Sequence, residues 1–399
     1  MNHIRQFPSL FVRRQRGLSL VEILVALVIS LFLIAGVIQL FISSKQTYRN
    51  YDALSRLQEN GRFALEAMSR DIRMASFTGC PRINPNPVFP IAAHWLANVL
   101  TNNAATWWTN FGANSVMGLE GNQVFPDPNI SFGTGSGDRV NGTDATILIG
   151  GGGGGYSINA VDPSAAPPTL TLAGVGNLGT GSILVICDAQ QTSIFQVTGL
   201  AGTTVSVGGG AGAPGNCMSG WGSTMASDAL NPCAGSPYSY ATNAIMTDFI
   251  PSAYYVGVST SGTTYSLYRL QMQVTGATTT ASMAAQELVE GVQDMQILYG
   301  EDTTNPPDGV VDRYLNANNI ANWNNVLSVR VNLLLVSLAD NLVPTPQQLM
   351  FPPEVVDGGG NLTSGTYSTH PSVICPNDRC LRQIFSTTVG IRNRLRVRS

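Results

Sequence analysis

Lysine and histidine are almost absent from this sequence: in 399 residues the one lysine is Lys45, and only three residues are histidines. Charged residues make up 11% of the chain, and its net charge is -3. Such a composition does not provide the broad basic surface on which nucleic-acid binding depends. We therefore expect no nucleic-acid partner. Arginines alternate with apolar residues at 392–398 and predict a strand edge whose charges face one side.

The motifs that would mark an enzyme are also missing. His3, His94 and His370 lie far apart in the sequence, and no H-E-x-x-H or G-x-S-x-G motif occurs. The six glycines at 150–155 lack the spacing of a phosphate-binding loop, and no Lys-Ser or Lys-Thr pair follows them. These glycines predict a flexible loop tip. We expect a protein that is not an enzyme and has no cofactor.

Proline is absent between Pro8 and Pro81, so no residue there forces a helix to break. Within this stretch, residues 17–42 form an almost unbroken apolar run of about 25 residues, long enough as a helix to cross a bilayer. Four arginines precede the run and no comparable basic cluster follows it, which predicts a cytoplasmic N-terminus and an external remainder. The run contains one acid, Glu22, whose burial in lipid costs roughly 2.5–3.5 kcal/mol.

The helical pattern continues after the apolar run. Larger apolar residues recur mostly at three- or four-residue steps and predict one face of an amphipathic helix. They are Tyr48, Tyr51, Leu54, Leu57, Leu65, Met68 and Ile72. Gly61 is the one weak point in this stretch. We expect a single helix over residues 18–77, roughly 90 Å long at 1.5 Å per residue, with Gly79-Cys80-Pro81 as its stop.

The rest of the chain predicts a large antiparallel β-rich head. Short β-branched runs divided by Gly, Asp or Asn indicate strands, at 145–149, 169–172, 182–187, 194–197 and 203–207. Further on we expect a hairpin at 254–270, a segment at 284–299 that begins helical and ends as a strand, and a long central strand at 323–337. Trp107 and Trp108 are expected in the core. Residues 208–239, rich in Gly, Ser, Pro and Ala, predict a long surface excursion.

Six cysteines lie in the part expected outside the cytoplasm, where disulfides persist. Cys375 and Cys380 are spaced too widely for a redox or zinc C-x-x-C pair and predict a local disulfide. A Cys217–Cys233 bond would tie the 208–239 excursion at its base. That choice leaves Cys80–Cys187 to join the end of the helix to the sheet, although other pairings stay open.

An acidic segment at 301–312 allows two interpretations. Its oxygen-bearing side chains around a glycine, namely Asp302, Asn305, Asp308 and Asp312, resemble a calcium loop. The spacing departs from the EF-hand rule, and Pro306-Pro307 interrupts it. A plain acidic turn is the alternative, and we expect no other metal site.

The residues Gly17-Leu18-Ser19-Leu20-Val21-Glu22, followed by the apolar run, resemble the class III leader of type IV prepilins. The resemblance implies that a prepilin peptidase cleaves after Gly17 and that the new terminus on Leu18 is N-methylated. Family members usually have Phe in this first mature position. Glu22 would lie on the helix face of the new amine and, as the resemblance implies, would neutralise the amine of a neighbouring subunit. A self-paired acid in a plain membrane anchor is the alternative.

Three blocks resemble the minor pilins of the PilW type. They lie at 57–80, at 288–300 with its continuation through 323–337, and at 383–394. The resemblance implies a role in priming type IV pilus assembly near the tip, with other minor and major pilins and a tip adhesin as partners, and links to adhesion and twitching motility. It also implies a protein that spans the inner membrane once, with a periplasmic head, before it enters the pilus. A minor pseudopilin of a type II secretion system, or an adhesin that binds through 208–239, stays open.

The expected fold class is therefore α+β, in a type IV pilin-like arrangement. A leader peptide would occupy residues 1–17 and a long helix residues 18–79. That helix would have a membrane-spanning or filament-core half at 18–42 and an amphipathic half at 43–79. A β-rich head would occupy residues 80–399.

Overall fold

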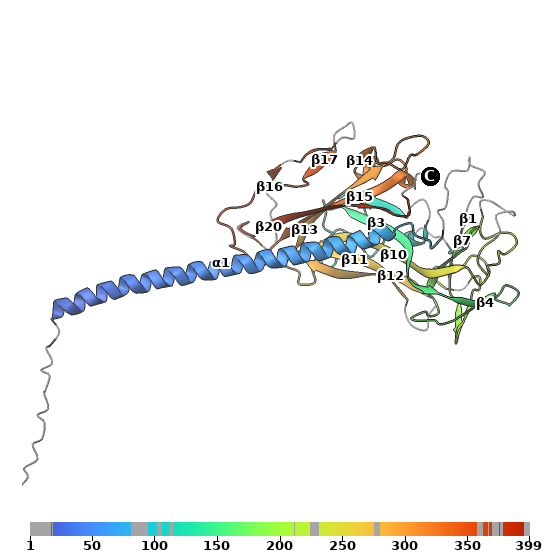
Figure 1. The fold of residues 1–399 in the computed structure, drawn as a ribbon, viewed down its shortest axis with the longest axis horizontal. Helices are drawn as coiled ribbons and strands as arrows, with labels where there is room; N and C mark the ends of the chain where they lie inside the picture. The colour runs from blue at the N-terminus through green and yellow to red at the C-terminus, as the bar shows by residue number, and fades with distance from the viewer. Residues whose placement is uncertain are drawn as a thin grey trace, which may run out of the picture. The chain divides into compact units, whose positions relative to one another are not determined.

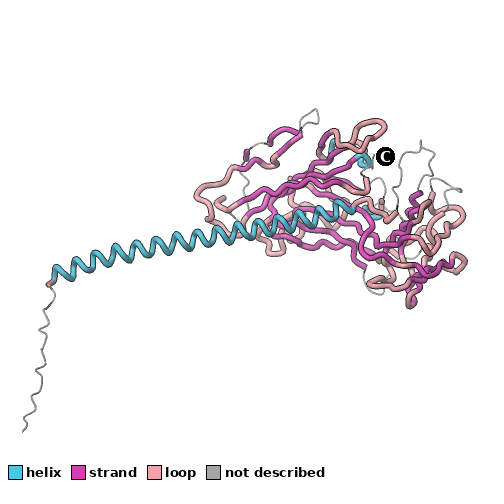
Figure 2. The backbone as a smooth tube through the Cα atoms, viewed as in Figure 1, coloured by secondary structure: helices cyan, strands magenta, loops and turns pink. Residues whose placement is uncertain are grey.

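The structure is a computed structural model that describes residues 17, 19–80, 95–101, 106–111, 115–210, 212–223, 231–274, 280–356, 362–365, 367, 368, 375 and 378–394. Two compact units divide the chain, Met1–Asp52 and Ala53–Ser399. Figure 1 follows the elements along the chain, and Figure 2 separates helix from strand and loop. The long N-terminal helix and the β-rich remainder confirm the expected α+β class.

Helix α1 runs from Leu20 to Met74 without interruption, as expected from the missing prolines. It is long and apolar enough to cross a membrane. In the first unit every described helical residue up to Arg49 is exposed. The helix ends at Met74, and Ser76 takes the left-handed conformation after it, at a φ of 64°. The expected glycine stop at Gly79 therefore lies a few residues beyond the helix end.

In the second unit α1 buries one face, as the amphipathic pattern predicts. The buried residues follow three- and four-residue steps and are Ala53, Leu57, Gly61, Ala64, Met68, Ser69 and Ile72. Tyr48 and Tyr51 were wrongly placed on this face, because they are 74% and 70% exposed. The prediction counted only large side chains. Four of these seven buried residues are in fact small, and they let the helix approach the sheets closely.

In the described part of the chain, twenty strands and three short 3-10 helices make up the remaining regular structure. The strands are β1 (Trp95–Asn98), β2 (Val116–Leu119), β3 (Ala145–Tyr156), β4 (Ile158–Asp162), β5 (Thr169–Leu172), β6 (Ile183–Cys187), β7 (Gln191–Gln196), β8 (Gly199–Ala201), β9 (Thr204–Ser206), β10 (Ile245–Val258), β11 (Tyr265–Val274), β12 (Ala281–Glu290), β13 (Val292–Glu301), β14 (Arg313–Leu315), β15 (Val326–Val336), β16 (Leu349–Met350), β17 (Glu354–Val356), β18 (Leu362–Ser364), β19 (Tyr367–Ser368) and β20 (Arg382–Gly390). The 3-10 helices are η1 (Trp107–Thr109), η2 (Ala317–Asn319) and η3 (Trp323–Asn325).

Two sheets organise the head. The first has eight strands, with β1-β7-β6-β10-β11-β12 in order and β3 paired to β10 and β2. The second has the order β14-β13-β15-β20, so the long strand expected at 323–337 is central, as predicted. The β10–β11 hairpin is confirmed as well. Every pairing in these two sheets is antiparallel except β1 with β7.

The main hydrophobic core lies where α1 meets both sheets. It joins Leu57 and Met68 of the helix to Tyr254 of the first sheet and to Val331 and Leu333 of the second. A second core covers the other face of the first sheet and contains Trp108 and Phe111. The expected burial of Trp108 is confirmed, whereas Trp107 is only partly buried and packs against that core. The helix is therefore part of the head's interior along its second half.

The expectation of a loop at 150–155 is wrong, because these glycines belong to β3. A Cβ at Gly150 would collide with the carbonyl oxygen of Met74, and Gly153 has a φ of 76° at a bulge in the pairing with β10. Glycine normally weakens a strand. Here its missing side chain lets the end of α1 lie directly on the sheet.

The expected helical start at 284–299 is also wrong. Residues 281–290 form strand β12 on β11, and the chain turns at Gly291, whose φ is 89°, into β13 of the second sheet. A Cβ at Gly291 would lie 2.7 Å from the carbonyl oxygen of Val336. The helix-forming residues Ala284 and Ala285 are overridden by cross-strand pairing, as weak local propensities often are.

The excursion at 208–239 is only partly a surface feature. Its described residues contain no helix or strand, as expected. Trp221, however, is completely buried and packs edge-on against Tyr240 in a third core. The glycine-rich composition of this segment gave no indication that Trp221 would be a core residue.

A buried acid joins the two sheets, and a second acid lies nearby in β13. Asp144, 4% exposed, accepts a hydrogen bond from the Ile297 backbone nitrogen at 2.8 Å. Burial raises the pKa of Asp144 to about 8, and the nearby carboxylate of Glu120 adds to the shift. Burial also raises the pKa of Asp294 to about 6. The Arg139 guanidinium favours the ionised Asp144 but does not outweigh burial.

We predict that the head loses stability as pH rises from about 4 to about 8. An acid whose folded pKa lies above its unfolded value of about 3.9 stabilises the fold fully below that value and loses this contribution as pH rises toward the folded pKa. Asp144→Asn should flatten the decline and raise stability at pH 8 by about 1 kcal/mol or more. Chemical unfolding midpoints across pH measure this. An unchanged slope in Asp144→Asn, or equal flattening by the exposed control Asp308→Asn, would contradict it.

A second prediction concerns Gly61, where a Cβ would lie 2.6 Å from the Phe385 ring of β20. Gly61→Val should destabilise the protein by about 1–3 kcal/mol through overpacking, despite the better helix propensity of valine. Thermal unfolding measures the loss. In a Phe385→Ala background, which removes the ring, the same substitution should cost markedly less. Equal costs in both backgrounds would show that the close contact is not the cause.

Candidate assembly site

Ser19 and Glu22 define the start of α1. The Ser19 carbonyl accepts the first helical hydrogen bond, from the Ile23 nitrogen, and the Ser19 hydroxyl accepts one from the Glu22 nitrogen at 3.2 Å. Ser19 is thus the N-cap, and Ser-x-x-Glu matches the spacing of a capping box. Sequence reasoning missed this motif although its spacing is readable. Glu22 also lies in the first turn, where the helix dipole favours a negative charge.

The Glu22 carboxylate has no charged partner among the described residues. Gly17 is exposed, and Leu18 lies outside the described residues. The assigned roles of Gly17, Leu18 and Glu22 therefore stay predictions. The structure does show that Glu22 stands at the head of a helix whose following turns are apolar on every side.

The apolar half of α1 is uncovered by the rest of the described chain. Leu20 is 75% exposed, Phe32 76%, Leu40 71% and Phe41 70%. Exposed apolar surface on this scale marks a membrane or protein interface. The Ser30 hydroxyl donates to the Ala26 carbonyl at 2.7 Å, so this polar group is satisfied inside the helix. The segment is built to lie in an apolar medium.

An ion pair between described residues ties the second half of α1 to the first sheet of the head. Asp71 accepts from the Tyr254 hydroxyl of β10 at 2.7 Å and pairs with Arg269 of β11 at 2.8 Å. The side chains of Asp71 and Arg269 are 10% and 16% exposed, so the pair is largely shielded from water. This contact ties the helix to the first sheet in a fixed register.

The residues after β20 hold the end of the helix. The Asn393 side chain donates to the Ala75 carbonyl at 3.1 Å, which satisfies one of the free carbonyls of the last turn. Arg394 donates to the Ser76 hydroxyl at 3.0 Å, to Ser115 at 2.8 Å and to the Trp323 carbonyl. We call Asn393 and Arg394 the C-terminal clamp. It joins the end of the helix to Ser115, which precedes β2 of the first sheet, and to Trp323, which precedes β15 of the second.

The expected charged strand edge at the C-terminus is wrong for the described part. Strand β20 ends at Gly390, and 392–394 form a turn. Arg394 is 5% exposed because it takes part in this clamp. Arg392 is exposed, and Arg396 and Arg398 lie outside the described residues.

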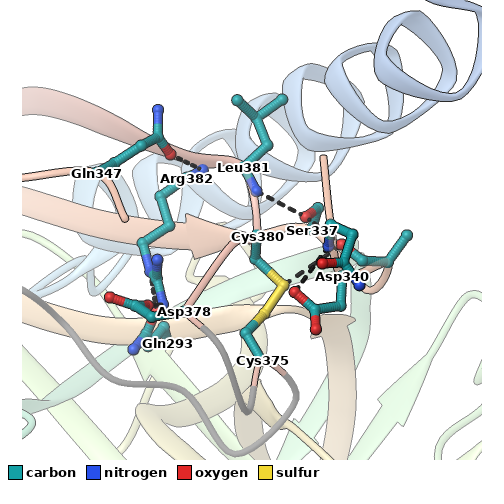
Figure 3. A network of polar contacts seen from close by, with 11 residues as sticks. Gln293, Ser337, Asp340, Gln347, Cys375, Asp378, Cys380, Leu381 and Arg382 are labelled. Atoms are coloured by element: carbon teal, nitrogen blue, oxygen red, sulfur yellow. Dashed lines mark hydrogen bonds and ion pairs between the residues drawn. A yellow bond between two sulfur atoms is a disulfide. The ribbon is translucent and has the colours of Figure 1, made fainter. Parts of the chain in front are cut away.

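Three disulfides join the expected pairs, Cys80–Cys187, Cys217–Cys233 and Cys375–Cys380. The last closes the loop that leads into β20 (Figure 3). There the buried Arg382 pairs with Asp378 and donates to the Gln293 side chain at 2.9 Å. Cys80–Cys187 thus ties the segment after α1 to β6, whereas each of the other two disulfides closes a loop.

The acidic segment after β13 uses its carboxylates to shape its own backbone. Asp302 is buried and accepts from the Gly309 nitrogen at 2.7 Å, and Asp312 accepts from the Thr303 nitrogen at 2.7 Å. That second bond lowers the pKa of Asp312. Among the described residues, Asp302, Asp308 and Asp312 do not form a group with ligand atoms within 4.8 Å of one another. Asn305 lies in the same loop, and calcium binding here stays a prediction.

The described residues contain one cluster with metal-ligand side chains, Asp340 with Cys375 and Cys380. Its two sulfur atoms are joined in the disulfide of Figure 3 and are not available as thiolates. His3, His94 and His370 lie outside the described residues.

Two families match the chain. Residues 12–38 match the prokaryotic N-terminal methylation motif, and residues 253–393 match the type IV pilus-assembly protein W family. No curated protein and no solved structure matches the chain. The second match includes the expected block at 288–300 and nearly all of 383–394, whereas the block at 57–80 lies outside both matches.

The methylation motif at the start of a long apolar helix and the β-rich head define a type IV pilin-like protein. Within that class, the match over residues 253–393, which include the second sheet and Asn393, supports a minor pilin of the PilW type. The chain is a membrane-anchored component of a type IV pilus system.

We predict that Asp71→Ala destabilises the head by about 3 kcal/mol, because it leaves Arg269 without its shielded partner. Urea unfolding of the full chain in detergent measures this. Glu59→Ala, an exposed acid on the same helix, serves as the control and should change stability by less than about 0.5 kcal/mol. A loss in Asp71→Ala no larger than in the control would rule out a structural role for the ion pair.

Proposed function

We propose that this protein primes the assembly of a type IV pilus and occupies a place near the pilus tip. The observation that supports this most is the half of α1 up to Ile42, which nothing in the described chain covers and which carries one acid in its first turn. In the inner membrane lipid would cover this surface, and in a filament the apolar helices of other pilins would replace lipid.

The proposed assembly step is electrostatic. After cleavage following Gly17 the amine of Leu18 is cationic, and a carboxylate in an apolar medium gains far more from an opposite charge than it does in water. Glu22 of one subunit would pair with the amine of a neighbouring pilin and set the axial offset between the helices. Its place in the first helical turn supports this, because the carboxylate already lies beside the amine end of the helix.

The head would supply the lateral contacts. It would lie in the periplasm before assembly and at the cell surface afterwards, with other minor and major pilins and a tip adhesin as neighbours. The size of the head, from Ala53 to Ser399, and its long irregular loops favour a place near the tip over a tightly repeated shaft.

Glu22→Gln should leave membrane insertion intact, since the amide is easier to bury than the carboxylate. The variant should enter filaments at least about tenfold less, because the interhelical charge pair is lost. Immunoblots of membranes and sheared filaments measure both quantities. Glu59→Gln, on the same helix but in the head, is the matched control. Normal incorporation of Glu22→Gln would refute the role of this acid.

Deletion of the gene tests the proposed function as a whole. Cells should lose surface pili, adhesion and twitching motility, and expression of the intact gene should restore them. Normal pili with loss of secreted proteins would instead assign the chain to a type II secretion system as a pseudopilin. Piliated cells that no longer adhere would assign it to adhesion through the head.

A further inference from the structure

A cavity of about 340 Å³ lies in the head beside the end of α1. The last turns of the helix form one wall, β3 and β10 form the floor, and β11 contributes Arg269. All of these elements belong to the second unit. The cavity plays no part in the assembly step proposed for Glu22.

Apolar side chains flank the opening. Met74 of α1 is 37% exposed and Ile250 of β10 is 36% exposed, although both belong to a well-packed head. Leu148 of β3 lies deeper and is buried. A ligand with an aliphatic group would gain by covering these two exposed side chains.

The floor of the cavity includes glycines of β3, and packing does not require all of them to be glycine. A Cβ at Gly150 would strike the helix backbone, so that glycine is structural. A Cβ at Gly152 would meet only the flexible ends of Ile250, at 3.2 Å, and Met74, at 3.8 Å. The fold therefore tolerates a side chain at Gly152, and its absence keeps the cavity open.

Positive charge lines the same cavity. Arg70 and Arg269 share one carboxylate, Asp71, which Arg269 approaches to 2.8 Å and Arg70 only to 3.7 Å. Asp71 also accepts the Tyr254 hydroxyl. The Arg70 side chain is 71% exposed, and the Arg269 Nε is buried without a hydrogen-bond partner in the described structure. Among the described residues that line the cavity, two guanidinium charges therefore share one carboxylate.

We propose that this cavity binds an acidic segment of a partner protein, with a carboxylate on Arg70 and an adjacent aliphatic side chain over Gly152 between Met74 and Ile250. Charge complementarity selects an acidic partner, because the described lining residues include two guanidinium groups, Arg70 and Arg269, and a single carboxylate, Asp71. The two exposed apolar side chains select a neighbouring aliphatic residue. A guanidinium also presents several donors to a carboxylate, which fixes the orientation of the segment.

The full chain in detergent micelles, labelled with ¹³C at the methionine methyl groups, tests the proposal by NMR. The probe is the peptide acetyl-Gly-Leu-Asp-Leu-Gly-amide, and the Met74 signal is assigned with Met74→Leu. Addition of the peptide should shift the Met74 signal and saturate at roughly millimolar concentration. The analogue with Asn in place of Asp should bind about tenfold more weakly or not at all.

Two variants locate the site. Gly152→Val fills the floor and should abolish the shift, whereas the matched control Gly155→Val should not, because a Cβ there meets nothing within 4 Å. Arg70→Gln, at an exposed position, should weaken binding about tenfold and keeps the test decisive if Gly152→Val fails to fold.

No shift, an equal response to the Asn peptide, or a response retained in both Gly152→Val and Arg70→Gln would overturn the proposal. An equally strong response to N-acetylleucine would assign the cavity to small carboxylic acids. It would therefore also overturn the proposal that a segment of a partner protein binds there. Loss of the response in Gly152→Val or Arg70→Gln, with Gly155→Val unaffected, would support it.

Discussion

The packing of one helix face against two sheets is the contact on which the rest of the head depends. Leu57, Met68 and Ile72 enter a single core with residues of both sheets, and small residues such as Gly61 and Ala64 set how closely the helix approaches. Without this contact the residues of both sheets that pack against the helix in the main core would be open to water. The disulfides and the clamp at Arg394 add fixed points around this core.

The first half of the same helix, by contrast, packs against no other part of the described chain. Up to Ile42 its residues are apolar on every side, and the described chain offers no surface that covers them. The second half of α1 buries one face within the head. The first half buries no face within the described chain, so its apolar surface needs other molecules to cover it. This division explains why a single charged residue, Glu22, has such weight in the proposed assembly step.

Much of this architecture could be predicted from local patterns. The missing prolines, the apolar run and the stripe through Leu57, Met68 and Ile72 indicated the helix. The strand patterns indicated β3, β6, β10, β11 and β15 among others, but missed long strands such as β12 and β20. The errors have a common physical cause, since they fall where tertiary contacts override composition. Gly150 of β3 looked like part of a loop because the backbone that it packs against, at Met74, is remote in sequence. Arg394 looked like a surface charge because its partners come from three other segments of the chain, at Ser76, at Ser115 and at 323–326. Gly61 looked like a weak point because the ring of Phe385 is remote in sequence.

The central claim is that cleavage after Gly17 creates a cationic helix end for the acid in the first turn to meet. Mass spectrometry of the intact protein from membranes and filaments tests this most directly. The account predicts a mature chain that begins at Leu18, carries one added methyl group on its terminal nitrogen and retains the whole helix. A protein that still begins at Met1, or one that has lost the apolar half of α1, would contradict it.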